Sequence, residues 1–204
     1  MSGVALIDYG AGNLQSVHNA LIAAGASDIA VTSDPSTVLA GKRIVLPGVG
    51  AFAHCMGALS AIPGMLEALN EAVVTNGRPF LGICVGMQLM ADAGHEHGVT
   101  PGLGWIGGVV APIAPAADVK VPHMGWNDVT PLRPHPVVEA GEAYFLHGYA
   151  FAAENEADVI AMTDHGGPRV AAIARDTMMG VQFHPEKSQT YGIATLRRFL
   201  KWRP

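Results

Sequence analysis

The stretch from Pro79 to Gln88 constrains the fold more than any other part of the chain. A short apolar run there leads to a cysteine that stands between two glycines, Gly82 and Gly86. This pattern predicts a strand, a sharp turn and the start of a helix, because a nucleophile raised on a tight turn needs small neighbours to avoid clashes. Cys84 would then lie at a helix N-terminus, where the positive end of the helix dipole favours the thiolate, the form that attacks carbonyl carbon.

The first half of the chain alternates between two kinds of hydrophobic spacing. Strand-like apolar runs are found at residues 4–8, 28–31, 43–46 and 79–83, and helical spacing is found at residues 13–24, 34–39, 51–59 and 64–76. Strands that alternate with helices in this way predict a parallel sheet that is covered by helices on both faces.

The second half is richer in strands. Short strand-like runs separated by turn residues lie at 105–113, 125–130, 143–146, 159–163, 170–174 and 178–183, and a last helix is predicted at 192–202. We find no internal repeat or low-complexity linker that would mark a domain boundary. The sequence therefore predicts a single α/β domain over residues 1–204, with a mainly parallel central sheet flanked by helices and an antiparallel β extension.

Charge and cysteine content limit the kinds of partner that we expect. The formal net charge is −5, without a run of like charge, which gives no reason to expect nucleic acid or an anionic membrane surface. Met1 to Ala5 lead directly into a strand-like segment without the features of a signal peptide, and no apolar run approaches membrane-spanning length. The two cysteines are too few for a disulfide framework. We therefore expect a cytoplasmic protein with a free thiol.

A glycine-rich segment, Pro47-Gly48-Val49-Gly50, follows the third predicted strand. Such a turn can aim backbone N–H groups of Gly48, Val49 or Gly50 into a cleft at the carboxyl edge of the sheet. With the N–H of Val85, the residue after the nucleophile, it would supply two donors for the negative oxygen of a tetrahedral intermediate. An ordinary turn explains the segment equally well, and it gains weight only because a candidate nucleophile follows on the next strand.

Near the C-terminus, His184 and Glu186 flank a proline in the segment Gln182-Phe183-His184-Pro185-Glu186. In an extended chain residues i and i+2 project to the same side, so the carboxylate can steady the imidazole while its other nitrogen faces the thiol. The alternative interpretation is a turn after an edge strand. The combination of an elbow cysteine, a glycine-rich loop and this segment favours catalysis.

Three other features indicate no cofactor. Gly10 and Gly12 suggest a dinucleotide fingerprint, but Gln15 stands where the third glycine would be. The residues His95 to His97 offer possible metal ligands in a Gly-rich loop, but no third ligand has a recognisable spacing. Cys55 lies in a helix-like segment and is interpreted as a packing residue. We therefore expect neither a metal ion nor a cofactor.

The residues Gly82 to Gln88, together with His184-Pro185-Glu186, resemble the catalytic signature of class I glutamine amidotransferases. Further blocks along the chain are similar to the glutaminase subunits of imidazole glycerol phosphate synthases, namely those at residues 8–14, 47–52, 121–127, 144–147 and 184–189. The catalytic motifs are shared by many amidotransferases, whereas the block Pro122-His123-Met124-Gly125-Trp126-Asn127 and Lys187 after the catalytic glutamate single out this subunit.

The resemblance implies an activity and a role for each matching residue. Cys84 attacks the side-chain amide carbon of glutamine, His184 gives a proton to the departing ammonia, and Glu186 orients the imidazole. Water then releases glutamate. By the same resemblance, Gln88 and Glu96 hold the amino-acid end of the substrate, and the loop N–H groups described above bind the oxyanion.

The resemblance also implies a partner. A chain occupied by one glutaminase domain has no room for an acceptor site, so the ammonia is expected to pass to a cyclase subunit with a (β/α)8 barrel. This heterodimer would make imidazole glycerol phosphate for histidine biosynthesis, and the glutaminase would be active only conditionally. Asn13, His123, Trp126, Tyr144 and Lys187 lie in the blocks that would face the cyclase, although they could also be ordinary surface or core residues.

Two alternatives stay open at this point. The first is the glutaminase of another pathway, such as pyridoxal phosphate synthesis, against which the block at residues 122–127 speaks. The second is a non-catalytic regulatory domain of the same fold, which the intact Cys84, His184 and Glu186 disfavour. One departure from the family pattern is Gly148, which stands where the family usually has a serine, so a contribution of a serine side chain to substrate binding is lost at this position.

Overall fold

The computed structural model describes residues 3–115 and 119–204. Met1 and Ser2 lie outside the described residues. They belong to the N-terminal segment, Met1 to Ala5, in which the sequence shows no features of a signal peptide. The elements of the first half are β1 (Val4–Ile7), α1 (Leu14–Ala24), β2 (Ile29–Thr32), α2 (Pro35–Ala40), β3 (Arg43–Gly48), α3 (Phe52–Ser60), α4 (Met65–Asn70), the π-helical turn η1 (Glu71–Thr75), β4 (Phe80–Cys84) and α5 (Val85–Gln88). The alternation of strands and helices that was predicted for this half is confirmed.

The second half contains the remaining strands and the last helix. Its elements are β5 (Ala93–Gly94), β6 (Thr100–Pro101), β7 (Gly108–Pro112), β8 (His123–Pro131), β9 (Gly141–His147), β10 (Tyr149–Ala153), η2 (Glu156–Asp158), β11 (Val159–Asp164), β12 (Pro168–Arg175), β13 (Met178–Val181), η3 (Pro185–Lys187) and α6 (Gln189–Lys201). The strand predicted at 105–113 is shorter than expected, and the last helix begins three residues earlier than predicted.

Most strands join one sheet of nine strands in the order β2-β1-β3-β4-β13-β12-β11-β8-β9. The strands from β2 to β13 pair in parallel, and those from β13 to β9 pair antiparallel. The sheet is therefore mixed, and the predicted antiparallel extension continues the parallel part directly. Strand β13 joins the two parts, because it lies parallel to β4 and antiparallel to β12.

A second sheet of four strands, in the order β10-β7-β5-β6, was not predicted. Strand β10 pairs antiparallel with β7, and β5 and β6 are only two residues long. Elements as short as these are fixed by their partners in space and not by a periodic pattern in the sequence.

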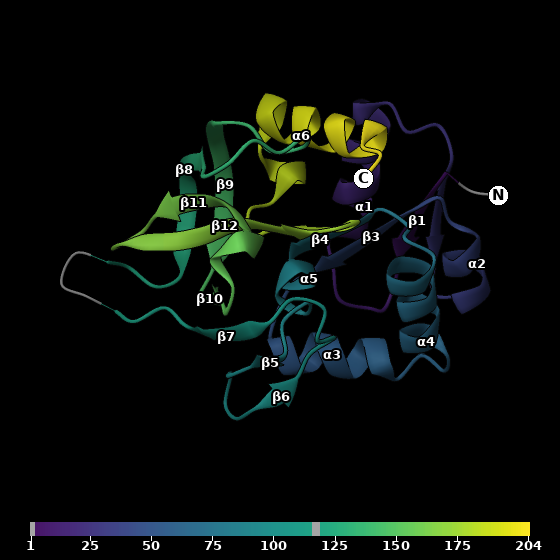
Figure 1. The fold of residues 1–204 in the computed structure, drawn as a ribbon, viewed down its shortest axis with the longest axis horizontal. Helices are drawn as coiled ribbons and strands as arrows, with labels where there is room; N and C mark the ends of the chain where they lie inside the picture. Colours follow the sequence, from purple (N-terminus) through teal and green to yellow (C-terminus); the bar gives the residue numbers. More distant parts are fainter. Residues whose placement is uncertain (1–2, 116–118) are drawn as a thin grey trace.

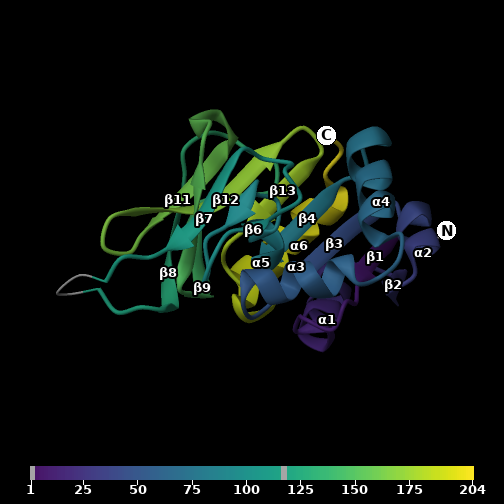
Figure 2. The same cartoon turned by 90° about the horizontal axis from the view of Figure 1, so that it is seen from below.

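Helices cover the parallel part of the large sheet on both faces. Figure 1 shows α1 and α6 together on one side of β3 and β4, and α3 and α5 on the other side. Figure 2 shows that β7, β8, β9, β11 and β12 extend away from the helical part. Among the described residues, no single helix is long and apolar enough to cross a membrane; only the bent pair Phe52–Ser60 and Met65–Thr75 meets the length and composition requirement together.

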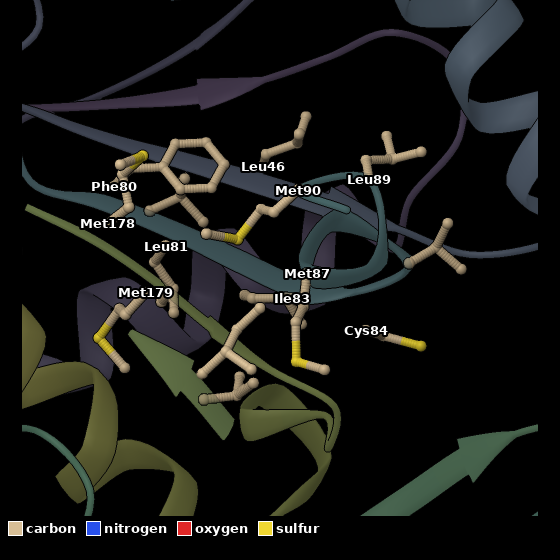
Figure 3. Packing of buried hydrophobic residues seen from close by; sticks show 14 of the residues in the cluster. Leu46, Phe80, Leu81, Ile83, Cys84, Met87, Leu89, Met90, Met178 and Met179 are labelled. Atoms are coloured by element: carbon tan, nitrogen blue, oxygen red, sulfur yellow. The ribbon is translucent and has the colours of Figure 1, made fainter. Parts of the chain in front are cut away.

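The core lies between the parallel strands and their helices. The side chains of Phe80, Leu81 and Ile83 on β4 are buried against neighbours that include Met87, as Figure 3 shows. Each fully buried large apolar side chain stabilises the fold by roughly 1.5–3 kcal/mol relative to exposure, so this strand is held firmly. In the same figure, the sulfur of Cys84 points away from the apolar cluster at the end of the strand.

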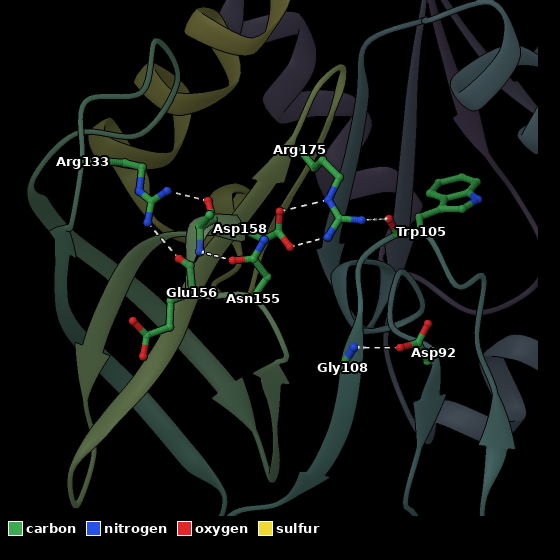
Figure 4. A network of polar contacts seen from close by, with 9 residues as sticks. Asp92, Trp105, Gly108, Arg133, Asn155, Glu156, Asp158 and Arg175 are labelled. Carbon is green, nitrogen blue, oxygen red and sulfur yellow. Dashed lines mark hydrogen bonds and ion pairs between the residues drawn. The ribbon is translucent and has the colours of Figure 1, made fainter.

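A polar network fastens the antiparallel part. Arg175 on β12 forms an ion pair with Asp158 in η2 and donates to the carbonyl oxygen of Trp105 (Figure 4). Arg133 donates to two carbonyl groups of the same turn. These contacts tie the connection after β10 to the end of β12 and thereby limit movement of the strands that lead to β13.

Candidate active site

Cys84 is the residue at which β4 turns into α5. Its backbone has φ 54° and ψ −111°, in the region that L-residues rarely adopt, and such strain is retained where the surrounding structure fixes the chain. Both flanking glycines are required by close packing. A Cβ atom on Gly82 would lie 2.5 Å from the carbonyl oxygen of Gly86, and one on Gly86 would lie 1.9 Å from the carbonyl oxygen of Leu46. The predicted elbow is therefore present, and its glycines allow β3, β4 and α5 to touch.

The glycine-rich segment after β3 lies next to this elbow. A Cβ atom on Gly48 would meet the nitrogen of Gly86 at 2.7 Å, so the two backbones are in contact. Tyr9 donates a hydrogen bond to the carbonyl oxygen of Pro47 at 2.8 Å, and burial raises the pKa of Tyr9, which keeps its hydroxyl a donor. The thiol of Cys55 donates to the carbonyl oxygen of Val49 at 3.4 Å. Cys55 is thus buried as predicted, and it also holds this loop.

His184 and Glu186 lie just beyond β13. His184 Nδ1 is 2.8 Å from Glu186 Oε1, so this nitrogen carries the proton that the carboxylate accepts, and Nε2 is the nitrogen left for another partner. The contact is made by the 3₁₀ turn η3, which begins at Pro185, and not by the extended segment that was predicted. The other carboxylate oxygen, Oε2, is buried without a hydrogen-bond partner among the described residues, so the imidazole is the group that offsets its charge.

The electrostatics of this group favour a protonated imidazole. Burial alone would lower the pKa of His184, but its interactions with the side chains of Cys84 and Glu186 outweigh burial and raise the pKa to about 10. A thiolate beside an imidazolium is the reactive state of a cysteine nucleophile. The interaction with Cys84 therefore joins the elbow to the histidine and carboxylate.

Cys84 and His184 line a small cavity of about 140 Å³, and Glu186 is bonded to His184 outside this lining. The walls of the cavity are formed by Val49, Gly50, Cys84, Val85, Gln88, Leu146, His147, His184 and Lys187. A cavity of this size suits a ligand smaller than the drug-sized molecules that fill about 300–1,000 Å³. A larger hollow of about 750 Å³ lies along residues 131–140, and its lining contains no candidate nucleophile.

The cavity brings together most of the predicted substrate residues. Val49, Gly50, Val85 and Gln88 line it, with Gly50 at a φ of 107° that favours glycine, whereas Gly48 packs behind them. Glu96 does not line the cavity. Its carboxylate accepts a hydrogen bond from the N–H of Phe52 at 2.7 Å, at the beginning of α3.

The residues predicted to face a partner fall into two groups. Trp126 is 47% exposed on β8 and meets Tyr144 of β9 edge to face, with ring centroids 6.2 Å apart. Lys187 lies over the Tyr144 ring at 5.8 Å and also lines the cavity, so this surface adjoins the candidate site. Asn13 is partly exposed at the start of α1. His123 is different: it is only 3% exposed, which agrees with the alternative of a core residue and not with a residue that faces a partner.

Buried polar groups of the antiparallel strands surround the site, and sequence reasoning did not assign them a role. His147 hydrogen bonds to His123 at 3.1 Å and through Nδ1 to the carbonyl oxygen of Tyr149 at 2.7 Å. Ser188 accepts from the N–H of Tyr144 and donates to the carbonyl oxygen of His184. No local pattern could have revealed these residues, because each finds its partner on a different strand or turn.

Gln182 is also buried near the nucleophile without a predicted role, although it belongs to the segment that contains His184. Gly148, the departure from the family pattern, has ordinary space around it. A Cβ atom there would meet only a methyl group of Val121, at 3.7 Å. The backbone would therefore accept the serine that the family usually has.

Comparisons with known proteins agree with this site. A family model described as glutamine amidotransferase class-I matches residues 5–202. The imidazole glycerol phosphate synthase subunit HisH of Zymomonas mobilis is 60% identical over 207 residues, which cover 100% of this chain and 97% of that protein. The subunit HisH of Rhodopseudomonas palustris is 52% identical, with 98% of this chain and 99% of that protein covered.

Solved structures share the fold at lower identity. A glutamine amidotransferase crystal structure superposes with a TM-score of 0.76 at 19% identity, and the alignment covers 98% of each chain. A putative GMP synthase subunit from Thermoplasma acidophilum gives a TM-score of 0.69 at 18% identity, with 98% of this chain and 93% of that chain covered. Because the family model and full-length relatives at 60% and 52% identity agree, the chain belongs to the class I glutamine amidotransferase family and, within it, to the HisH subunits of imidazole glycerol phosphate synthase.

Proposed function

We propose that this chain hydrolyses glutamine to glutamate and ammonia, and that it passes the ammonia to a cyclase subunit that makes imidazole glycerol phosphate in histidine biosynthesis. The observation that supports this most is the elbow cysteine beside the buried pair of His184 and Glu186, at a small cavity, in a chain whose relatives are synthase subunits over their full length. The residues 1–204 would act as one glutaminase domain, without a metal ion or cofactor.

The first half of the reaction forms a thioester. The thiolate of Cys84 attacks the side-chain amide carbon of glutamine, and the negative oxygen is bound by N–H groups of Val85 and of the segment from Val49 to Gly50. The imidazolium of His184 donates its Nε2 proton to the departing nitrogen, which leaves as ammonia. Gln88 contacts the substrate from the cavity wall. Glu96 does not line the cavity, but only its Oε2 accepts from the N–H of Phe52, so its other oxygen would be the one to accept from the amino group of the substrate.

The second half releases glutamate. Neutral His184 takes a proton from a water molecule, the hydroxide attacks the thioester carbon, and the Cys84 thiolate leaves. Glu186 keeps the imidazole in the orientation and tautomer that both halves require, because its oxygen holds the Nδ1 proton at 2.8 Å. Each turnover consumes one water molecule and yields one glutamate and one ammonia.

The surface around the cavity supports a protein partner with a (β/α)8 barrel. Met124 and Trp126 are 66% and 47% exposed on the same strand, and an exposed apolar patch of this kind marks an interaction site. Lys187 and Tyr144 connect this patch to the cavity, and Asn13 would contribute from α1. A partner seated there would receive ammonia before water protonates it. The described chain holds its two cysteines as free thiols, which suits the reducing cytoplasm that we propose as its compartment.

A direct experiment uses Cys84→Ala with the cyclase subunit. We expect the variant complex to lose glutamine hydrolysis and glutamine-dependent synthesis, while synthesis with added ammonium salt continues at the wild-type rate. Loss of both reactions would contradict the division between the two subunits. His54→Gln provides the control, because that side chain is exposed on α3 outside the cavity lining and its loss should leave hydrolysis within a few-fold of the wild type.

The two alternatives are supported less well. A glutaminase of pyridoxal phosphate synthesis would not be expected to match subunits HisH over the full chain. A non-catalytic regulatory domain would have no need of a strained nucleophile beside a buried histidine and carboxylate. Labelling of Cys84 by a glutamine-like electrophile separates the catalytic function from the non-catalytic one.

A further inference from the structure

The side chain of Gln182 is fully buried and its amide nitrogen lies 3.7 Å from the sulfur of Cys84. The strand register explains this position, because β13 pairs with β4 in parallel with Val181 beside Ile83. One residue further along each strand, Gln182 comes beside Cys84. Phe183 points to the other side, where it is buried against Phe145, so residues 182 and 184 both turn toward the nucleophile.

The orientation of the Gln182 amide is fixed by a chain of hydrogen bonds that begins at a backbone carbonyl. The oxygen of Tyr149 can only accept, and it receives a hydrogen bond from Gln88 Nε2 at 3.1 Å. The same nitrogen of Gln88 is 3.0 Å from Gln182, which must therefore present its oxygen, Oε1. The NH₂ group of Gln182 then faces the sulfur of Cys84.

The sulfur of Cys84 has two polar contacts, one with Leu146 and one with Gln182, and they stabilise different protonation states of the sulfur. The thiol of Cys84 donates to the carbonyl oxygen of Leu146 at 3.8 Å, a contact that is lost when the proton leaves. The N–H of Gln182 can be kept in both states, and it strengthens when the sulfur becomes charged, because hydrogen bonds to ions are stronger than neutral ones. Gln182 therefore favours the thiolate over the thiol.

We propose that Gln182 is a further catalytic residue of the glutaminase, which donates a hydrogen bond to the Cys84 thiolate in addition to the charge supplied by His184. This inference rests on the proposed function, in which that thiolate is the nucleophile. Gln88 has a second role in this arrangement. Besides lining the cavity, it holds the Gln182 amide in the orientation that presents nitrogen, and not oxygen, to the sulfur.

The test measures the alkylation of Cys84 by iodoacetamide as a function of pH, in the full chain, with mass spectrometry of the Cys84 peptide to separate it from Cys55. Gln182→Met removes the donor at similar size, and Gln182→Glu replaces the donor by a charged acceptor. We expect the midpoint of the rate profile to move up by about one pH unit in the methionine variant, and further in the glutamate variant. At pH values below both midpoints, the rate in the methionine variant should be about tenfold lower than in the wild type.

Gln15→Met is the matched control, because Gln15 is exposed on α1 and bonds only to Asn19. Its profile should coincide with that of the wild type. An unchanged midpoint in a folded Gln182→Met or Gln182→Glu variant would overturn the proposal, and the near-ultraviolet circular dichroism of each variant establishes that it is folded.

Glutamine hydrolysis by the same variants with the cyclase subunit distinguishes this inference from the proposed function. We expect kcat to fall about tenfold in Gln182→Met, with KM changed less than threefold, since the residue touches the sulfur and does not line the cavity. If the wild-type complex does not hydrolyse glutamine, the proposed function fails whatever the alkylation profile shows. If hydrolysis is present but neither the midpoint nor kcat moves, only the role of Gln182 fails.

Discussion

Acidification from pH 7 to pH 5 should destabilise this protein through two buried histidines. His123 on β8 and His147 on β9 are 3% and 6% exposed, and their ring nitrogens lie 3.1 Å apart. The ring of His123 is stacked between Phe145 and His165, at centroid distances of 4.7 and 4.0 Å. Neither imidazole has a carboxylate among its hydrogen-bond partners in the described chain, so a proton gained there would be buried without an opposite charge.

The hydrogen bonds of the pair have a single direction. The carbonyl oxygen of Tyr149 accepts from Nδ1 of His147, so Nε2 of His147 must accept from Nδ1 of His123. Nε2 of His123 in turn accepts from the amide of Asn127 at 3.1 Å. Each ring therefore uses one nitrogen as an acceptor. Protonation of that nitrogen in either ring would place two N–H donors opposite each other and break the hydrogen bond.

These contacts agree with strongly lowered pKa values. Burial first, and then the charges of the neighbouring histidines, lower the pKa of His123 to about 3, and burial lowers that of His147 to about 4. In the unfolded chain both groups have a pKa near 6.5. Between pH 7 and pH 5 the unfolded state therefore binds protons at these two rings, whereas the folded state does not, and this difference favours unfolding. At about 1.4 kcal/mol per pKa unit, each histidine lowers the free energy of unfolding by about 2 kcal/mol over this range.

His184 acts in the opposite direction and only weakly over the same range. Its pKa is raised to about 10, so protonation of His184 stabilises the folded state, and this stabilisation is lost as the pH rises toward 10. Most of it is already present at pH 7, and it increases by about 1 kcal/mol between pH 7 and pH 5. The three groups together should therefore lower the free energy of unfolding by about 3 kcal/mol. This is a large part of the roughly 5–15 kcal/mol that is typical of a domain.

The assay is urea unfolding followed by circular dichroism at pH 7, 6 and 5. His123→Asn removes one titrating ring but retains an N–H that can reach His147, so we expect the loss between pH 7 and pH 5 to fall from about 3 to about 1 kcal/mol. The variant will also be less stable at pH 7, and only the slope with pH decides the question. The exposed His54→Gln on α3 is the control and should keep the wild-type slope. Equal slopes in wild type and His123→Asn would refute this explanation.

Two further substitutions test the elbow and the partner surface. Gly86→Ala sets a methyl group against the carbonyl oxygen of Leu46, and should cost about 3 kcal/mol or more in urea unfolding. Gly57→Ala, on α3 with no atom within 4 Å, should instead stabilise by about 0.5–1 kcal/mol, and a similar loss in both would refute the steric argument. Trp126→Ala should weaken binding of the cyclase subunit by about 2 kcal/mol in calorimetric titration, without lowering the melting temperature by more than a few degrees. Unchanged affinity would remove Trp126 from the interface.

Local sequence pattern was sufficient for the elements that carry their own periodicity. The run from Phe80 to Ile83, the glycines around Cys84 and the helical spacing before them predicted the parallel half, because buried parallel strands are continuous apolar runs. Strands β5, β6 and β10 have no such signal and depend on pairing partners elsewhere in the chain. For the same reason, the sequence left His123 open between a residue that faces a partner and a core residue. Its burial depends on His147, which lies 24 residues away on the next strand.

The position of β13 explains why the catalytic groups meet although they lie far apart in sequence. A parallel sheet collects the carboxyl ends of its strands at one edge, and β13 is the last strand that runs in that direction before the sheet becomes antiparallel. The offset between β13 and β4 is fixed by buried partners such as Val181 and Ile83, so Gln182 arrives beside Cys84 and His184 follows on the same side. A shift of the register by one residue would turn both side chains away and bring Phe183 to the sulfur. The chemistry of the site therefore depends on apolar packing along β13 as much as on the polar residues themselves.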